Sequence, residues 1–152
     1  MGGHPPEFSS ARNQGTTGLT PRLLLDTHVV VRWLAEPKRL SQDQIRALRG
    51  AVRRGEPLAL SAITLLEIAI LFGEGGSRLR VAVRELFGAL NPGAGFHVVP
   101  LDVEVAAEVA ALGDMLRDPA DRAIVATARV HRLRLVTSDQ RIIESKLVPV
   151  LE

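Results

Sequence analysis

The stretch that decides the fold is Arg117-Asp-Pro-Ala-Asp-Arg-Ala-Ile-Val-Ala-Thr-Ala128. Asp118 followed by Pro119 predicts the start of a helix, because the acid can accept from the free N–H groups of the first turn and proline suits the first helical position. The apolar residues within Ile124–Ala128 recur at helical spacing, which indicates that this helix packs on a core. Asp121 lies three residues after Asp118, so both carboxylates are expected on the same side of the first turn.

Two interpretations of this acidic pair are open. Asp118 and Asp121 can simply cap the helix and interact with its dipole. Alternatively, they belong to a site that also uses Asp26, Glu67 and Asp139, three further acids in positions where an acid needs an explanation. The positions of these three acids in the predicted elements therefore decide between the two interpretations.

The composition is that of a soluble globular protein with one domain. The chain has 152 residues, of which 46% are hydrophobic and 24% charged, both ordinary values. Aromatic residues make up 3%, so we expect an aliphatic core. No apolar run approaches the ~20 residues that cross a bilayer. The first residues do not resemble a signal peptide, so a cytoplasmic location and no membrane partner are the default expectations.

The absence of cysteine and the arginine-rich charge limit which metal ligands and which partners are possible. The chain contains no cysteine, which leaves oxygen and imidazole as metal ligands and excludes disulfides. The net charge is only +2, yet the pI is about 9.9 because nearly all basic residues are arginines. Arginine suits phosphates and carboxylates, so nucleic acid is an admissible partner that the composition does not require.

The order of elements predicts an α/β fold. Residues 1–20 are rich in glycine, proline and small polar residues, and we interpret them as a disordered extension or a cloning remnant, followed by one domain over 21–152. Short apolar runs then alternate with helical patterns, which predicts a mostly parallel central sheet with helices on both faces. The predicted strands are 22–26, 58–60, 96–101, 132–137 and 147–151, and the predicted helices are 27–35, 42–54, 62–72, 77–90, 103–116, 119–131 and 140–145.

The three further acids lie where sites form in such a fold. Asp26 and Asp139 each follow a predicted strand, at the edge of the sheet where ligands bind in open α/β proteins, although each could also cap the next helix. Glu67 lies in a helix that is apolar nearly all round, which indicates burial. A buried lone carboxylate is costly, so we expect either an arginine partner or a metal ion beside Glu67.

Several carboxylates in one pocket cannot all stay ionised without a cation. Oxygen ligands without cysteine or a histidine pair favour Mg²⁺ or Mn²⁺. Such an ion suits the cleavage of a phosphodiester, since it activates water and stabilises the leaving oxygen.

Four motifs in this order resemble those of a PIN domain, of the kind found in the VapC-type toxins of bacterial toxin–antitoxin pairs. The resemblance covers roughly residues 22–152. The motifs are Leu23-Leu-Leu-Asp-Thr-His28, Ser61-Ala-Ile-Thr-Leu-Leu-Glu67, the Asp118–Ala128 stretch and Leu135-Val-Thr-Ser-Asp139.

The resemblance implies a Mg²⁺- or Mn²⁺-dependent endoribonuclease that acts on RNA as the toxin of a pair. The family's pocket acids match Asp26, Glu67, Asp121 and Asp139, with the ion held by Asp26, Asp121 and Asp139. The residues expected beside these ligands are Asp118, Thr27 and Ser138. The resemblance further implies a cognate VapB-like antitoxin and a homodimer. Arg117 departs from the pattern, because the family often has histidine there, which puts substrate contacts at this point in doubt.

Two other functions remain open. A binding module of the same fold could keep the acids for stability without cleaving RNA. A phosphotransfer enzyme of the haloacid-dehalogenase kind could use Asp26 as its nucleophile, but such enzymes want a second aspartate two residues on, where this chain has His28. The helical segments 29–34 and 65–72 carry more aliphatic surface than one small sheet can cover, so we expect a groove or a dimer face there.

Overall fold

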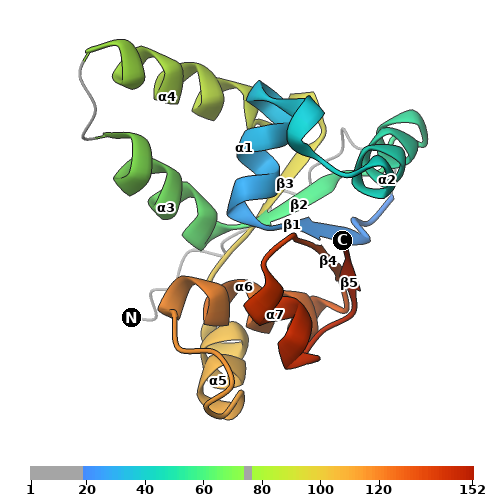
Figure 1. The fold of residues 1–152 in the computed structure, drawn as a ribbon, viewed down its shortest axis with the longest axis vertical. Coiled ribbons are helices and arrows are strands. Elements are labelled where there is room, and N and C mark those ends of the chain that lie inside the picture. The colour runs from blue at the N-terminus through green and yellow to red at the C-terminus, as the bar shows by residue number, and fades with distance from the viewer. Residues whose placement is uncertain (1–18, 74–76) are drawn as a thin grey trace, which may run out of the picture.

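The structure, a computed structural model, describes residues 19–73 and 77–152 (Figure 1). Nearly all of the extension predicted over residues 1–20 therefore lies outside the described residues, and the division into extension and domain stays a prediction. The elements are β1 (Leu23–Leu25), α1 (Thr27–Ala35), α2 (Gln42–Arg53), β2 (Leu58–Ser61), α3 (Ala62–Gly73), α4 (Ser77–Ala89), β3 (Phe96–Val99), α5 (Val103–Ala111), α6 (Pro119–His131), β4 (Arg134–Val136), α7 (Gln140–Ser145) and β5 (Val150–Leu151).

The described strands form one parallel sheet of five, in the order β3-β2-β1-β4-β5. The prediction of a parallel sheet with helices on both faces is therefore confirmed. The chain moves outward from β1 to β2 and β3, and then returns to the other side of β1 to form β4. This reversal makes the carboxyl ends of β1 and β4 the switch point of the sheet, where ligands bind in open α/β folds.

Alternation along the short strands divides the core between two layers. Leu24 and Leu135 face a cluster with α5, α6 and α7, whereas Leu25 and Val136 face a second cluster with α1 to α4. Figure 1 shows the corresponding layers, with α5, α6 and α7 on one side of the sheet and α1 to α4 on the other. Both faces of the inner strands are thus buried, which explains why these strands read as unbroken apolar runs.

Two predictions about helices are wrong in instructive ways. The helix predicted over 103–116 ends at Ala111, and Gly113 follows with a φ of 73°. The Arg122 guanidinium of α6 donates to the carbonyls of Val109, Gly113 and Leu116 at 2.8, 2.6 and 2.7 Å. The Arg122 side chain, which comes from the next helix, therefore donates to carbonyls that would have accepted backbone N–H groups in a continued helix.

Helix α3 is apolar nearly all round, which predicts burial, and this prediction is wrong for one side of the helix. Leu66, Ile70 and Leu71 are 54%, 60% and 57% exposed, while Ile68 is fully buried. In Figure 1, α3 and α4 extend together from the sheet as an arm, so the sheet covers only one side of α3. The prediction of surplus apolar surface in 65–72 is confirmed for α3.

A search of the described helices found none that is both long and apolar enough to span a membrane.

Replacing Arg122 by alanine should destabilise the fold, because three carbonyls would lose charge-assisted donors in a half-buried position. We expect the free energy of unfolding to fall by about 2–4 kcal/mol, measured by urea denaturation. Arg117→Ala is the matched control, since Arg117 is exposed and should change stability by less than about 0.5 kcal/mol. Equal stability of both variants would show that the hydrogen bonds of Arg122 to the three carbonyls contribute nothing to the free energy of unfolding.

Candidate active site

The candidate site forms at the switch point between β1 and β4. Leu25 pairs with Val136 in the parallel register, and the Asp26 amide donates to the Val136 carbonyl at 3.0 Å. Asp26 therefore leaves the sheet directly beside Thr137, the first residue after β4. The chain enters α1 after Asp26 and α7 after Asp139, so both loops open at the same edge of the sheet.

The Asp26 carboxylate is the most buried acid of the site, with a residue exposure of 5%. Its Oδ1 accepts from the Thr27 amide at 2.8 Å, and its Oδ2 accepts from the Thr137 hydroxyl at 2.7 Å. Burial raises the pKa of Asp26 above its ordinary value, and these two hydrogen bonds oppose that rise. Asp26 is both the cap of α1 and a fixed group at the bottom of the site.

Two threonines connect Asp26 to the acids of other elements. The Thr27 hydroxyl donates to Glu67 Oε1 at 2.6 Å and also lies 3.0 Å from the Thr64 hydroxyl. The Thr137 hydroxyl, which donates to Asp26, accepts from the Asp139 amide at 3.1 Å. Thr27 thereby links Asp26 to Glu67 on α3, and Thr137 links Asp26 to the backbone of Asp139 before α7.

Asp121 reaches the site from the first turn of α6. Its pKa is raised to about 7, first by burial and then by the negative charges of Asp118, Asp139 and Asp26. Asp118 Oδ1 accepts from the Asp121 amide at 2.9 Å and caps α6. Asp118 is therefore a cap, as one interpretation held, and its charge also acts on Asp121.

Arg141 is a cation of the site that sequence reasoning missed. Its guanidinium lies 3.0 Å from Asp139 Oδ2 and 3.6 Å from Asp121 Oδ2. The side-chain hydrogen bonds from Arg141 are the main cause that lowers the pKa of Asp139. The sequence did carry a signal, because Arg141 stands two residues after a predicted site acid, in the first turn of the next helix.

The structure thus gathers Asp26, Glu67, Asp121 and Asp139, the four predicted acids. Glu67 is half-buried and accepts from the Thr27 hydroxyl, and among the side chains that the structure describes, which leave out those of residues 77–81, no arginine pairs with it. Of the residues predicted to lie beside these acids, Thr27 bonds both Asp26 and Glu67. The Ser138 hydroxyl instead accepts from the side-chain amide of the buried Gln44, at 3.1 Å. Thr137 is a second residue that sequence reasoning did not single out, although it directly follows a predicted strand.

The donor set suits a hard divalent cation, since it consists of carboxylate oxygens that repel one another. Each Asp26 oxygen accepts one hydrogen bond in the structure and keeps a lone pair for a further partner. Within residues 19–73 and 77–152, no three acidic or imidazole side chains already surround one point as a metal cage. The carboxylate oxygens of this set are the ligands that Mg²⁺ and Mn²⁺ prefer, so the chemistry of the donors fits either ion.

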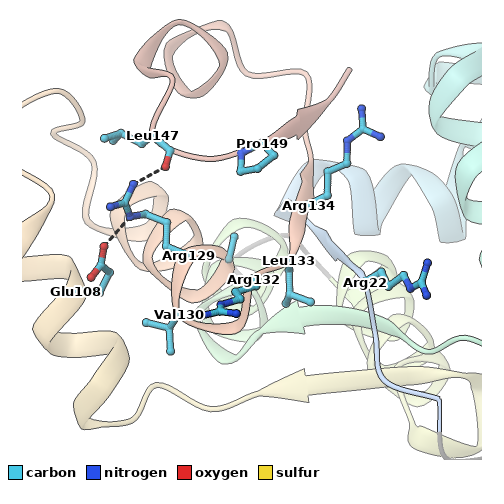
Figure 2. Close-up of a pocket in the computed structure, with 10 residues that line it drawn as sticks. Arg22, Glu108, Arg129, Val130, Arg132, Leu133, Arg134, Leu147 and Pro149 are labelled. Carbon is cyan, nitrogen blue, oxygen red and sulfur yellow. Dashed lines mark hydrogen bonds and ion pairs between the residues drawn. The ribbon is translucent and has the colours of Figure 1, made fainter.

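A separate, basic pocket lies at the other end of α6 (Figure 2). It has a volume of about 840 Å³ and is lined by Arg22, Arg129, Arg132 and Arg134 among other residues. Arg129 donates to Glu108 Oε1 at 2.6 Å and to the Leu147 carbonyl, as Figure 2 shows. Arg134 donates to the Val150 carbonyl at 3.1 Å. Arg129 and Arg134 thus bind backbone carbonyls of the C-terminal segment, away from the acids of the candidate site.

Comparison with known proteins agrees with the fold and the motifs. The family model of the PIN domain matches residues 23–146. The chain is 38% identical over 121 residues to Ribonuclease VapC22 of Mycobacterium tuberculosis, a match that covers 79% of this chain and 88% of that protein.

Solved structures give the same result. The FitAcB structure of Neisseria gonorrhoeae matches with a TM-score of 0.66 and 25% identity, covering 86% of this chain and 96% of the other. A chain of the DNA-bound VapBC2 structure of Rickettsia felis has a TM-score of 0.67 at 12% identity, covering 85% and 96%; at that identity the likeness shows the fold alone. With the family match over most of its length and a relative at 38% identity, this chain belongs to the PIN-domain family.

Proposed function

We propose that this chain is a Mg²⁺- or Mn²⁺-dependent endoribonuclease of the VapC type, the toxin of a toxin–antitoxin pair. The observation that carries the proposal is that Asp26, Asp121 and Asp139 lie close together at the switch point, where burial and then the charges of Asp118, Asp139 and Asp26 raise the pKa of Asp121 to about 7. The relative named Ribonuclease VapC22 supports RNA as the substrate. A catalytically inactive binding module of the same fold is the alternative.

Each acid has a role that follows from its surroundings. Asp26, Asp121 and Asp139 would hold the cation, with Asp26 fixed in orientation by Thr27 and Thr137. When bound, the ion supplies Lewis acidity to the phosphodiester and lowers the pKa of a water. Glu67, held by the Thr27 hydroxyl, would complete the shell and orient the attacking water. Thr27 thus bonds both acids, Asp26 through its backbone amide and Glu67 through its hydroxyl.

Replacing Asp26 by asparagine should reduce RNA cleavage to background while the protein stays folded, because the change removes a ligand and also relieves the burial of a charge. Cleavage of total bacterial RNA in Mg²⁺, followed by gel, measures this. EDTA should abolish cleavage by the unmodified protein, and added Mn²⁺ should restore it.

Asp114→Asn is the matched control, since Asp114 is exposed in the loop between α5 and α6, and its cleavage rate should equal that of the unmodified protein. Equal cleavage by Asp26→Asn and the unmodified protein, or full activity in EDTA, would contradict the mechanism. Failure of the unmodified protein to cleave RNA in either metal would favour the binding module.

Cleavage should also depend on pH through Asp121. A metal ligand must be deprotonated, and the pKa of Asp121 is raised to about 7 in the metal-free protein. Mg²⁺ affinity and cleavage at limiting Mg²⁺ should therefore rise as the pH increases from 6 to 8. Calorimetry and initial rates measure the two profiles.

Asp118→Asn isolates the cause of this pH dependence. Asparagine still caps a helix but removes a negative charge that raises the pKa of Asp121. The profile should move to lower pH while the helix content is unchanged. A profile that stays in place would show that the charge of Asp118 does not set it.

We further propose that an antitoxin covers the exposed apolar face of α3, formed by Leu66, Ile70 and Leu71. Relatives of known structure are toxin–antitoxin complexes, which supports a VapB-like partner encoded beside this chain. The homodimer stays a proposal, for which light scattering of the isolated protein is the measurement.

Ile70→Asp should prevent co-purification of the antitoxin encoded by the neighbouring gene, because it places a charge within the apolar face. Val52→Asp is the control, since Val52 on α2 is similarly exposed, at 56% against 60% for Ile70. Equal recovery of the complex with both variants would place the partner elsewhere.

A further inference from the structure

Arg141 has an unusual position for a basic residue beside a candidate metal site. Its Nη2 lies 3.0 Å from Asp139 Oδ2 and its Nε lies 3.3 Å from Asp139 Oδ1. Nη2 is also 3.6 Å from Asp121 Oδ2. One guanidinium therefore engages both oxygens of one proposed ligand and reaches a second ligand.

This arrangement competes with a cation. Asp139 Oδ1 accepts from Arg141 Nε and from the Arg141 amide at 2.9 Å, and Oδ2 accepts from Nη2. Both lone pairs of Oδ1 are used in this way, so an ion that binds Oδ1 in the plane of the carboxylate needs the one that the guanidinium uses, whereas Oδ2 keeps one lone pair. Two positive groups in contact with the same oxygens also repel each other. The guanidinium of Arg141 and an ion therefore compete for Asp139, directly at Oδ1 and through charge repulsion at Oδ2.

The released side chain is well placed for the substrate. Arg141 is tethered beside Asp139 through its backbone amide, so its guanidinium cannot move far from the site. The side chain is already 73% exposed, and little desolvation opposes its movement. Its planar fork matches a phosphate in the same way as it matches a carboxylate.

We propose that Arg141 is an RNA-phosphate-binding residue that occupies Asp139 and Asp121 until a divalent cation displaces it. The inference rests on the proposed function, since it assumes a metal at these acids and RNA beside them. In the metal-free protein Arg141 neutralises part of the acidic cluster. In the loaded enzyme the same charge holds a backbone phosphate next to the cleavage point.

The first test measures Mg²⁺ binding without RNA, by calorimetry at pH 9, well above the pKa of about 7 of Asp121. Arg141→Gln should bind Mg²⁺ about three- to tenfold more tightly, because the competitor is gone. Arg141→Lys should gain less, since an ammonium keeps the charge but cannot engage both oxygens of Asp139.

Arg117→Gln is the matched control for the charge alone. Arg117 is an exposed arginine next to the cap residue Asp118, and its replacement removes a nearby positive charge without freeing an oxygen of Asp139. Its effect on Mg²⁺ affinity should be smaller than that of Arg141→Gln. Equal gains for Arg117→Gln and Arg141→Gln, or no gain for either, would overturn the competition.

The second test uses a fluorescent pool of single-stranded RNA at saturating Mg²⁺. Arg141→Gln should raise KM about five- to tenfold and leave kcat within about twofold, as expected for a group that binds ground state and transition state alike. The slope of log affinity against log salt should fall by about 0.7, the value for one phosphate contact on a single strand. An unchanged KM and an unchanged slope would overturn the phosphate contact.

The ribonuclease function and the role of Arg141 are tested by different variants. If Asp26→Asn cleaves RNA as well as the unmodified protein does, the proposed function fails regardless of Arg141. If Asp26→Asn is inactive but Arg141→Gln leaves Mg²⁺ affinity unchanged, the function stands and the role of Arg141 is wrong.

Discussion

The hydrogen bonds to the buried Asp26 carboxylate are the interaction on which the rest of the site depends. A carboxylate with 5% exposure is costly unless donors compensate it. Here the donors come from α1 and from the residue after β4. The two inner strands must therefore be adjacent and in register before the acid is satisfied. The same two threonines then hold Glu67 and Asp139, so satisfying one acid places two others.

Charge crowding is the cost of this arrangement. Burial and then the charges of Asp118, Asp139 and Asp26 raise the pKa of Asp121 to about 7, and the charge of Arg141 offsets part of this repulsion. Such locally unfavourable groups are expected at functional sites, where stability is given up for chemistry. The far end of α6 shows the opposite pattern, because Arg129 and Arg134 there bond backbone carbonyls and support the fold.

The uncovered side of α3 has a geometric cause. The strands are short, and α3 and α4 extend past the edge of the sheet together (Figure 1). Ile68 turns toward the core, while Leu66 and Ile70 on the other side of the helix stay exposed. An apolar helix therefore does not by itself indicate burial within the single chain, and in this PIN domain the exposed side of α3 is available to a partner.

The sequence by itself determined the features that depend on neighbouring residues. The cap at Asp118 follows from a side chain that accepts from an amide three residues on, and the alternation of short apolar runs with helices determined the parallel sheet. The strand-end positions of Asp26 and Asp139 were readable for the same reason. Tertiary structure alone decided contacts between distant segments. The Thr137 hydroxyl donates to Asp26, which lies 111 positions earlier in the chain. Arg122 of α6 donates to the Val109 carbonyl near the end of α5. Arg141 of α7 lies near Asp121 of α6. These contacts depend on strand order and register, which place residues together irrespective of their spacing in the chain.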